Sequence, residues 1–478
     1  MKDQGFISLS AQQRQSITAD QAWHYGIIPK NSMNGNLEFY IDCENEVNNI
    51  KNDLEFLFGK NVTLEPVKSD VIIKTLNKYY QRDRADKQKA NTGKFNIASG
   101  DFIIDIITEA NKINSSDIHF EVYENKCRVR FRIDGRLVER YILNKDDYPA
   151  LINKIKIKAN LDIAEKRLPQ DGRIFYQQFE SQFDIRVSVL PSLYGEKVVL
   201  RLLSKDATRI DLTSLGFNEK QLEEYTANIK KPHGIILISG PTGSGKTTTL
   251  YASLKMLNKE HLNILTIEDP IEYTLEGINQ VQLKESIGLT FSSALRTFLR
   301  QDPDIIMLGE IRDAETAQMA IRAALTGHLV LSTIHTNSAW GTISRLIDMG
   351  VPPYLISATL NMSVAQRLVR KLCPECKKEE DLDITMVPAA VRNKTKMQKH
   401  FVPVGCDQCY FTGYKGRYAL YEIVSINESL SNHIKNSDIE EHMVYRENKI
   451  HRLSDIALNE YIAGNTSLEE VYPVLSAN

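Results

Sequence analysis

Apolar side chains in the region from residue 98 to residue 207 follow two successive patterns. Five of them recur on one face of a predicted helix near residue 102. Residues 128–137 then alternate charged and apolar side chains around an Asp-Gly pair, as a half-buried β-hairpin does. We therefore expect a small α/β domain at residues 98–207. The predicted helical face consists of Phe102, Ile103, Ile106, Ile107 and Ala110.

From residue 208 to residue 478, short apolar runs alternate with segments of helical spacing. This alternation predicts a parallel sheet flanked by helices. Each apolar run is followed by polar residues, and in an open parallel sheet such residues lie at the carboxyl edge, where ligands bind. The predicted strands are residues 234–239, 263–267, 304–308 and 329–334.

The chain before residue 98 is predicted to form a third part. Residues 23–29 and the alternating residues 37–41 are followed by segments of helical spacing that end near Tyr80. We expect a mixed module at residues 1–82, with docking as its default role. Residues 83–97 are expected to be a linker, since the stretch that begins near residue 81 is polar, mixed in charge and without an apolar face.

A glycine-rich loop follows the first strand of the large domain. Residues 240–247 match the P-loop pattern, in which backbone N–H groups surround phosphate oxygens at a helix N-terminus. Lys246 is expected to reach the β- and γ-phosphates of ATP, and the Thr247 hydroxyl to ligate Mg²⁺. A chance turn is the alternative, but the strand and the helix lie where the motif requires them. The predicted nucleotide-binding residues are Gly240, Pro241, Thr242, Gly243, Ser244, Gly245, Lys246, Thr247 and Thr248.

Two further strands lead into acidic residues. Glu268 and Glu272 follow residues 263–267, and either could orient a water that attacks the γ-phosphate. A helix cap or a turn acid is the alternative reading of each. Residues 304–308 followed by Gly309 and Glu310 look like a Walker B strand, whose acid holds a metal-bound water or positions the attacking one.

Two histidines flank the strand at residues 329–334. His335 follows its carboxyl end, with Thr336 and Asn337, where a sensor of the γ-phosphate belongs. His328 lies at the opposite end, and we expect it to stabilise an interface. A structural role is the alternative for either histidine.

The small domain is rich in arginine. A solvated strand face is the ordinary explanation. Since this domain directly precedes the P-loop domain, some of these side chains could instead reach the phosphates of a neighbouring subunit in a ring, where an arginine stabilises transition-state charge. The arginines are Arg128, Arg130, Arg132, Arg136, Arg167, Arg173, Arg186 and Arg201.

Four of the six cysteines form two CxxC pairs. Cys373 with Cys376, and Cys406 with Cys409, have the spacing of a closed tetrahedral zinc site with a structural role. A redox CxxC is the alternative, but it needs only one pair. We expect a zinc subdomain at residues 371–420 and helices at residues 425–478. The unpaired Cys43 and Cys127 suit a reducing compartment.

Composition limits the classes of function. A chain of 478 residues is too long for one core, so two to four domains are expected. Its net charge of -2 gives no overall electrostatic case for binding nucleic acid or a membrane surface. The N-terminus has no apolar signal core and no apolar run is long enough to span a bilayer, so we expect a cytoplasmic protein.

These motifs together resemble one known family, the hexameric ATPases of type II secretion and type IV pilus assembly, the GspE and PilB group. The resemblance extends from about residue 115 to residue 422 and includes the P-loop and the Walker B strand. Its other segments are SDIHFE at 116–121, LPQDGR at 168–173, GEKVVLR at 195–201, TIEDPIE at 266–272, ALTGHLV at 324–330 and TGYKGR at 412–417.

The resemblance implies a RecA-like P-loop domain in a homohexamer that moves an inner-membrane platform protein. It also implies a docking partner and peripheral membrane association through partners. By resemblance, Arg186 and Arg201 reach the nucleotide of the adjacent subunit, with Arg173 a weaker candidate. Glu268 resembles the acid for the attacking water, and Glu310 the Walker B acid. The cysteines match a zinc element that PilT-type retraction motors lack, which favours assembly or secretion.

Three other functions compete with this hypothesis. A motor of DNA uptake or conjugation uses the same chemistry, and neighbouring genes would separate it from a secretion motor. A nucleic-acid-binding protein whose cysteine ribbon grips DNA is disfavoured by the near-neutral charge. A nucleotide switch without turnover is disfavoured by the two glutamates at the sheet edge.

Overall fold

The chain forms two compact units in a computed structural model. One unit comprises residues 1–94 and 381–399, and the other comprises residues 95–380 and 400–478. The predicted linker at 83–97 lies outside the residues that the structure describes. The described residues are 6–7, 9, 13, 16–30, 37–43, 47–58, 60–80, 102–178, 181–203, 211–392, 394, 397–436 and 441–476.

In its described residues, the first unit contains a three-stranded sheet with three helices before residue 81, and the short helix α14 (Ala389–Arg392) in its second stretch. Strand β2 (Leu37–Asp42) lies in the middle, antiparallel to β1 (Ile27–Pro29) and parallel to β3 (Val62–Val67). The connection from β2 to β3 passes through a helix, as parallel pairing requires. Its core includes Phe39, Ile41 and Leu54. The helices are α2 (Ala19–Tyr25), α3 (Val47–Phe58) and α4 (Ser69–Tyr79).

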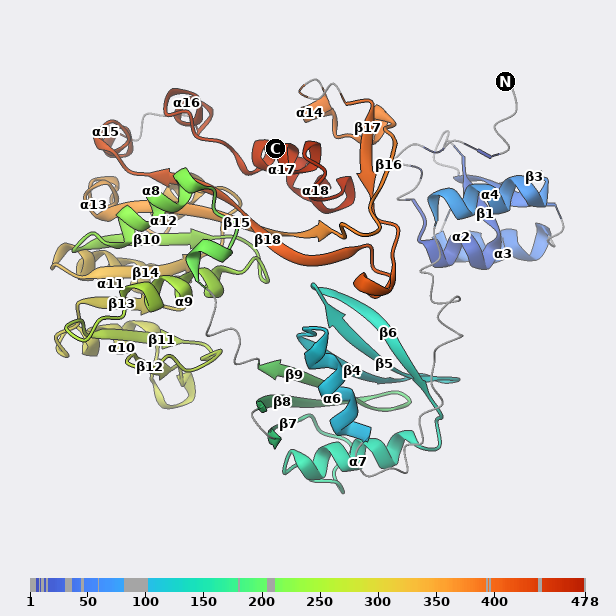
Figure 1. Ribbon diagram of the computed structural model, residues 1–478, viewed down its shortest axis with the longest axis horizontal. Coiled ribbons are helices and arrows are strands. Elements are labelled where there is room, and N and C mark those ends of the chain that lie inside the picture. The colour runs from blue at the N-terminus through green and yellow to red at the C-terminus, as the bar shows by residue number, and fades with distance from the viewer. Residues whose placement is uncertain are drawn as a thin grey trace. The chain divides into compact units, whose positions relative to one another are not determined.

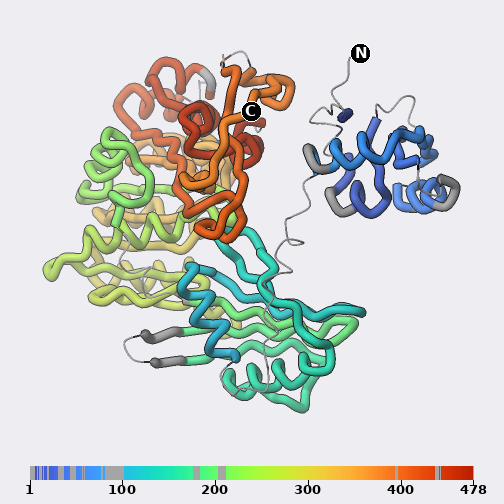
Figure 2. Tube along the Cα trace, turned by 45° about the vertical axis from the view of Figure 1, so that its right-hand side comes forward, coloured from blue at the N-terminus to red at the C-terminus, as the bar shows by residue number. Residues whose placement is uncertain are grey.

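A six-stranded antiparallel sheet begins the second unit. The strand order is β6-β5-β4-β9-β8-β7, and helices α6 (Phe102–Lys112) and α7 (Tyr148–Lys158) lie along it (Figures 1 and 2). The predicted helical face is confirmed, because its five residues are the buried ones of α6. The strands are β4 (Asp117–Val122), β5 (Cys127–Ile133), β6 (Arg136–Leu143), β7 (Gln170–Gln178), β8 (Ser181–Ser192) and β9 (Gly195–Leu203).

The predicted hairpin is also confirmed. Strands β5 and β6 pair through Ile133 and Arg136, and Asp134 and Gly135 between them have φ of 48° and 87°. Two successive positive φ values are those of a two-residue hairpin turn, which Asp-Gly adopts readily. The alternation in β5 places its arginines on the face opposite the apolar core.

One row of charged residues crosses this sheet from strand to strand. Arg173 of β7 pairs with Arg186 of β8, Arg186 with Arg201 of β9, and Arg201 with Asp117 of β4. Residues in register on neighbouring strands project to the same face. The two arginines expected at a nucleotide therefore share one face of the small domain.

A seven-stranded sheet forms the centre of the larger domain, in the order β12-β11-β13-β14-β10-β15-β18. Six strands are parallel and β18 is antiparallel to β15. The predicted α/β fold with a flanked parallel sheet is confirmed. The strands are β10 (Gly234–Ser239), β11 (Ile264–Glu268), β12 (Asn279–Gln282), β13 (Ile305–Leu308), β14 (Leu329–Ile334), β15 (Leu360–Leu372) and β18 (Tyr414–Ser425).

Helices flank this sheet and continue after its last strand (Figure 1). The core contains residues of β10, β13 and β14 together with α9, which packs through Leu250, Tyr251 and Leu254. No helix among the described ranges is both long and apolar enough to cross a membrane. The helices are α8 (Glu219–Ile229), α9 (Lys246–Leu257), α10 (Phe291–Phe298), α11 (Ala314–Leu325), α12 (Gly341–Asp348), α13 (Pro353–Thr359), α15 (Glu428–Asn436), α16 (Glu441–Glu447), α17 (Leu453–Ile462) and α18 (Leu468–Leu475).

Candidate active site and zinc centre

The carboxyl ends of four parallel strands bring the predicted residues together. In sheet order, β11 ends at Glu268, β13 leads into Glu310, β14 leads into His335, and β10 leads into the P-loop. All four ends lie at the same edge because the strands run in the same direction. The acids and the histidine expected from the sequence therefore lie beside the expected phosphate-binding loop.

The P-loop has the backbone that phosphate binding requires. Gly245, which precedes α9, has φ of 86°. A Cβ at Gly240 would lie 2.5 Å from the carbonyl oxygen of Gln366, so no larger residue fits without a shift in the backbone. The Ser244 hydroxyl is buried without a hydrogen-bond partner among the described residues. A phosphate oxygen is an acceptor that would satisfy it, so the loop fits the nucleotide.

The side chain of Lys246 folds back onto the P-loop that precedes it. Its Nζ donates to the carbonyl oxygens of Gly240 at 2.8 Å and Pro241 at 3.1 Å. Burial lowers the pKa of Lys246, and the charge of Glu310 opposes that shift while Arg367 adds to it. The amine is thus placed at the loop, where the charges of a carboxylate and of a second cation act on it.

Glu310 connects the Walker B strand with the histidine segment. Its Oε2 lies 3.1 Å from His335 Nε2, and its Oε1 accepts from Arg312 Nε at 2.6 Å. With the Thr247 hydroxyl on the first turn of α9, this carboxylate gives the oxygen ligands that Mg²⁺ prefers. His328 instead lies at the other end of β14, where Nδ1 is 2.8 Å from the Ala323 carbonyl oxygen.

The two acids that follow β11 differ in environment. The Glu268 side chain is 3% exposed, and its carboxylate accepts from Thr266 at 2.6 Å, from Gln280 at 3.1 Å and from the Tyr251 hydroxyl. The Glu272 side chain is 40% exposed. The sequence does not distinguish the two acids, but only Glu272 is open to solvent.

The predicted arginines also differ from one another in their contacts and exposure. Arg186 Nη1 lies 3.6 Å from Glu272 Oε2, and its Nη2 donates to the Ile271 carbonyl oxygen of the same chain. Arg201 Nε pairs with Asp117 at 3.1 Å, and the side chain is 57% exposed. Arg173 is half exposed and lies 4.0 Å from Asp184. Within one chain, Arg186 is therefore the arginine of this row that contacts the acidic segment.

Sequence reasoning missed a cation at the P-loop. Arg367 of β15 has Nη2 3.3 Å from the side-chain oxygen of Asn337, and a Cβ at Gly240 would lie 3.2 Å from its Nη1. Burial lowers the pKa of Arg367, with Glu422 opposing the shift. The sequence feature that could have located Arg367 is the extended run at residues 360–372. This run forms β15 and places Arg367 on a strand beside β10.

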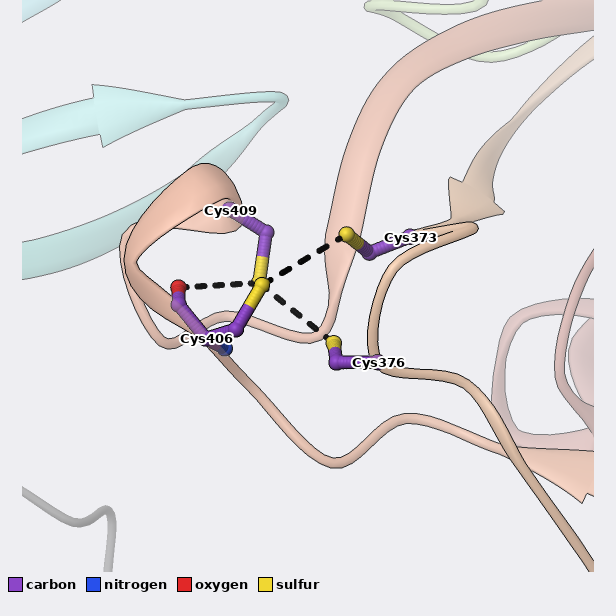
Figure 3. Close-up of side chains that lie close together, drawn as sticks. All are labelled: Cys373, Cys376, Cys406 and Cys409. Carbon is purple, nitrogen blue, oxygen red and sulfur yellow. Dashed lines mark hydrogen bonds between the residues drawn. The ribbon is translucent and has the colours of Figure 1, made fainter.

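The four paired cysteines converge at one point (Figure 3). Cys373 and Cys376 follow β15, and Cys406 and Cys409 precede β18. Sulfur separations are 3.9 Å for Cys373 and Cys406, 3.7 Å for Cys376 and Cys409, and 3.8 Å for Cys406 and Cys409. Tetrahedral zinc with bonds of about 2.3 Å places its sulfur ligands about 3.8 Å apart, so the cluster fits a closed structural site.

Comparison with known proteins identifies the family. The family model described as "Type II/IV secretion system protein" matches residues 98–473. The chain belongs to this family. It is 48% identical over 373 residues to "Type II secretion system protein E" of Pectobacterium carotovorum. The matched region covers 77% of this chain and 74% of that protein. The chain is 47% identical over 378 residues to "Type IV pilus assembly ATPase PilB" of Myxococcus xanthus, which covers 77% of this chain and 66% of that protein.

A solved structure of the pilus retraction motor PilT with bound ADP shares the fold. It is 26% identical and has a TM-score of 0.53, covering 78% of this chain and 96% of that chain. The predicted family, fold class and ATPase activity of this secretion family member are confirmed. ATP and Mg²⁺ are the cofactors of such an ATPase, and the four clustered cysteines fit a structural zinc ion.

Proposed function

We propose that this chain is the motor ATPase of a type II secretion or type IV pilus assembly machine. The observation that carries the proposal is the placement of the P-loop with Lys246, Glu310 and His335 at one sheet edge within a secretion-family domain, with Glu310 and His335 in contact. The motor works as a homohexamer and uses ATP hydrolysis to move an inner-membrane platform protein. It is cytoplasmic and reaches the inner membrane through its partners, including one that binds the module at residues 1–82.

The site residues have distinct proposed roles in this reaction. Residues 240–248 hold the phosphates, with Lys246 on the β- and γ-phosphates and Thr247 on Mg²⁺. Glu310 holds a metal-bound water or orients the attacking one, and His335 responds to the γ-phosphate through its contact with Glu310. Arg367 adds a second positive charge beside Lys246.

The domain boundaries belong to the same proposal. The arginine-bearing domain at residues 98–207 faces a neighbouring nucleotide, and the ATPase domain at 208–478 contains the zinc subdomain at 371–420. The shared face of Arg186 and Arg201 supports this arrangement, because a single approach of that face brings both guanidinium groups to one phosphate chain.

The purified chain should hydrolyse ATP only with Mg²⁺, and its rate should not change when DNA is added. Hexamers should form when a non-hydrolysable ATP analogue is present, because nucleotide between subunits stabilises the assembly. Light scattering coupled to gel filtration and a phosphate-release assay measure the two properties. DNA-stimulated turnover with retention on a DNA column would favour a nucleic-acid motor instead.

Mixing two inactive variants tests whether Arg186 acts between subunits. Arg186→Ala and Lys246→Ala subunits mixed in equal amounts should regain about a quarter of wild-type ATPase activity, because a random ring joins an intact P-loop to an intact neighbouring arginine at about that fraction of interfaces. Arg186 contacts Glu272 of its own chain, so the alternative is that Arg186 acts on the nucleotide of its own subunit. If Arg186 acts only within its own subunit, the mixture stays inactive.

A further inference from the structure

The Tyr251 hydroxyl lies at the centre of a buried cluster beside the P-loop. Tyr251 belongs to α9, the helix that begins with Lys246, and its side chain is 1% exposed. It donates to Glu268 Oε2, while the backbone N–H of Glu272 and the Gln280 amide lie 3.4 and 3.5 Å from the phenol oxygen. The helix that carries the phosphate-binding lysine is thereby joined to both ends of residues 268–272.

The residues around Tyr251 keep its hydrogen bond to Glu268 in one geometry and one protonation state. The Tyr273 ring meets the Tyr251 ring edge to face, with centroids 4.6 Å apart, which restricts the phenol ring. Burial and the neighbouring charge of Glu268 raise the pKa of Tyr251, so the hydroxyl stays protonated and remains a donor. The contact between Tyr251 and Glu268 is therefore a hydrogen bond from a phenol to a carboxylate, which is stronger than a hydrogen bond between neutral groups.

Both carboxylate oxygens of Glu268 already accept hydrogen bonds from buried side chains. Oε1 accepts from Thr266 and Gln280, and Oε2 accepts from Tyr251. A carboxylate held by three donors in a buried site is a fixed anchor for the chain around it. Within residues 268–272, the acids with solvent access are Glu272 and Asp269, and the position of this segment depends on that anchor.

We propose that Tyr251 is a positioning residue for ATP hydrolysis, which ties Glu268 and the acidic segment at residues 268–272 to the P-loop helix. This inference rests on the proposed ATPase function. Glu268 then acts by holding the segment in place, and Arg186 meets the segment at Ile271 and Glu272. The phenol sets the distance between that region and the phosphates.

A second buried phenol that bonds to α9 offers a matched control. Tyr225 of α8 is 0% exposed, and its hydroxyl lies 2.8 Å from Ser253 Oγ of α9. Tyr225→Phe and Tyr251→Phe each delete one buried phenol oxygen that bonds to or from α9, and Tyr251→Phe should cost somewhat more stability because its partner is a carboxylate. The Tyr225 bond joins α9 to α8 and does not reach the acidic segment.

Steady-state kinetics of the full-length protein separate positioning from stability. Tyr251→Phe should lower kcat by about tenfold while KM for ATP changes less than about twofold, because a misplaced segment affects the reaction geometry more than phosphate binding. Tyr225→Phe should change neither constant by more than about twofold. Both variants should remain folded, with Tyr251→Phe losing somewhat more thermal stability than Tyr225→Phe.

A double variant tests whether Tyr251 acts through Glu268. Tyr251→Phe combined with Glu268→Leu should be no slower than Glu268→Leu alone, because leucine already removes the acceptor of the Tyr251 hydrogen bond. Multiplied losses in the double variant would overturn the inference, as would equal kcat values for Tyr251→Phe and Tyr225→Phe. If Tyr251→Phe does not fold, Gln280→Met removes another donor to Glu268 and should show the same fall in kcat. A wild-type protein without ATP turnover would instead refute the proposed function.

Discussion

Replacing Lys246 by Ala is expected to lower kcat for ATP hydrolysis by about 100-fold or more, as the loss of a preorganised group on the reacting charge does. Lys246 is the cation at the start of α9, and its amine bonds to the carbonyl oxygens of Gly240 and Pro241 at the loop. When phosphates enter, their charge replaces those carbonyl oxygens as the partner of the amine. Alanine removes this interaction from both the bound nucleotide and the transition state.

Lys255 supplies the control for that substitution. It lies on the same helix, and its Nζ pairs with Asp211 on the surface at 2.8 Å. Lys255→Ala should leave kcat within about twofold of wild type, since exposed ion pairs contribute little. Phosphate release under saturating ATP measures both variants. Hydrolysis at the wild-type rate by Lys246→Ala would remove the P-loop from the mechanism.

Replacing Cys409 by Ser is expected to release the zinc ion and lower the thermal midpoint by about 10 °C, because structural zinc contributes directly to folding free energy. Cys409 is buried and accepts N–H bonds from Cys406 and Gly413, both at 3.2 Å. A serine oxygen is a poor replacement for a thiolate at zinc. Elemental analysis and a thermal melt monitor the two effects.

Cys43→Ser is the matched control for the zinc prediction. Cys43 is an exposed thiol outside the cluster, so its loss should change neither metal content nor the thermal midpoint. A Cys409→Ser protein that keeps one zinc ion per chain and melts like wild type would contradict a structural four-cysteine site. Chelation of the wild-type protein should reproduce the substitution.

The parts of the fold that follow from local pattern were predictable from the sequence. Strands β10, β11, β13 and β14 are apolar runs, and the residue that follows each one lies at the ligand edge by topology alone. Strand β12 was missed because it is a polar strand at the sheet edge, and β15 was missed because Arg367 and Arg370 interrupt its apolar residues. Pairing with distant strands decides both.

The site was predictable only as a set of residues. The sequence places Glu268 and Glu272 after the same strand, but burial of Glu268 depends on Tyr251 and Gln280, which belong to other elements. The contact of Arg186 with Ile271 likewise needs two domains. Interactions of this kind depend on tertiary packing, which no local pattern encodes. The roles of these residues in hydrolysis stay predictions.

The neighbour of Gly240 has a consequence for synthesis of the protein. Gly240 lies so close to the Gln366 carbonyl oxygen that β15 forms one wall of the P-loop, and parallel pairing holds β15 beside β10. When the P-loop has left the ribosome, β15 has not yet been synthesised, and neither has Arg367, which β15 carries. The nascent chain can complete its nucleotide pocket only after β15 emerges, so ATP becomes a ligand only once the chain has been made past residue 372.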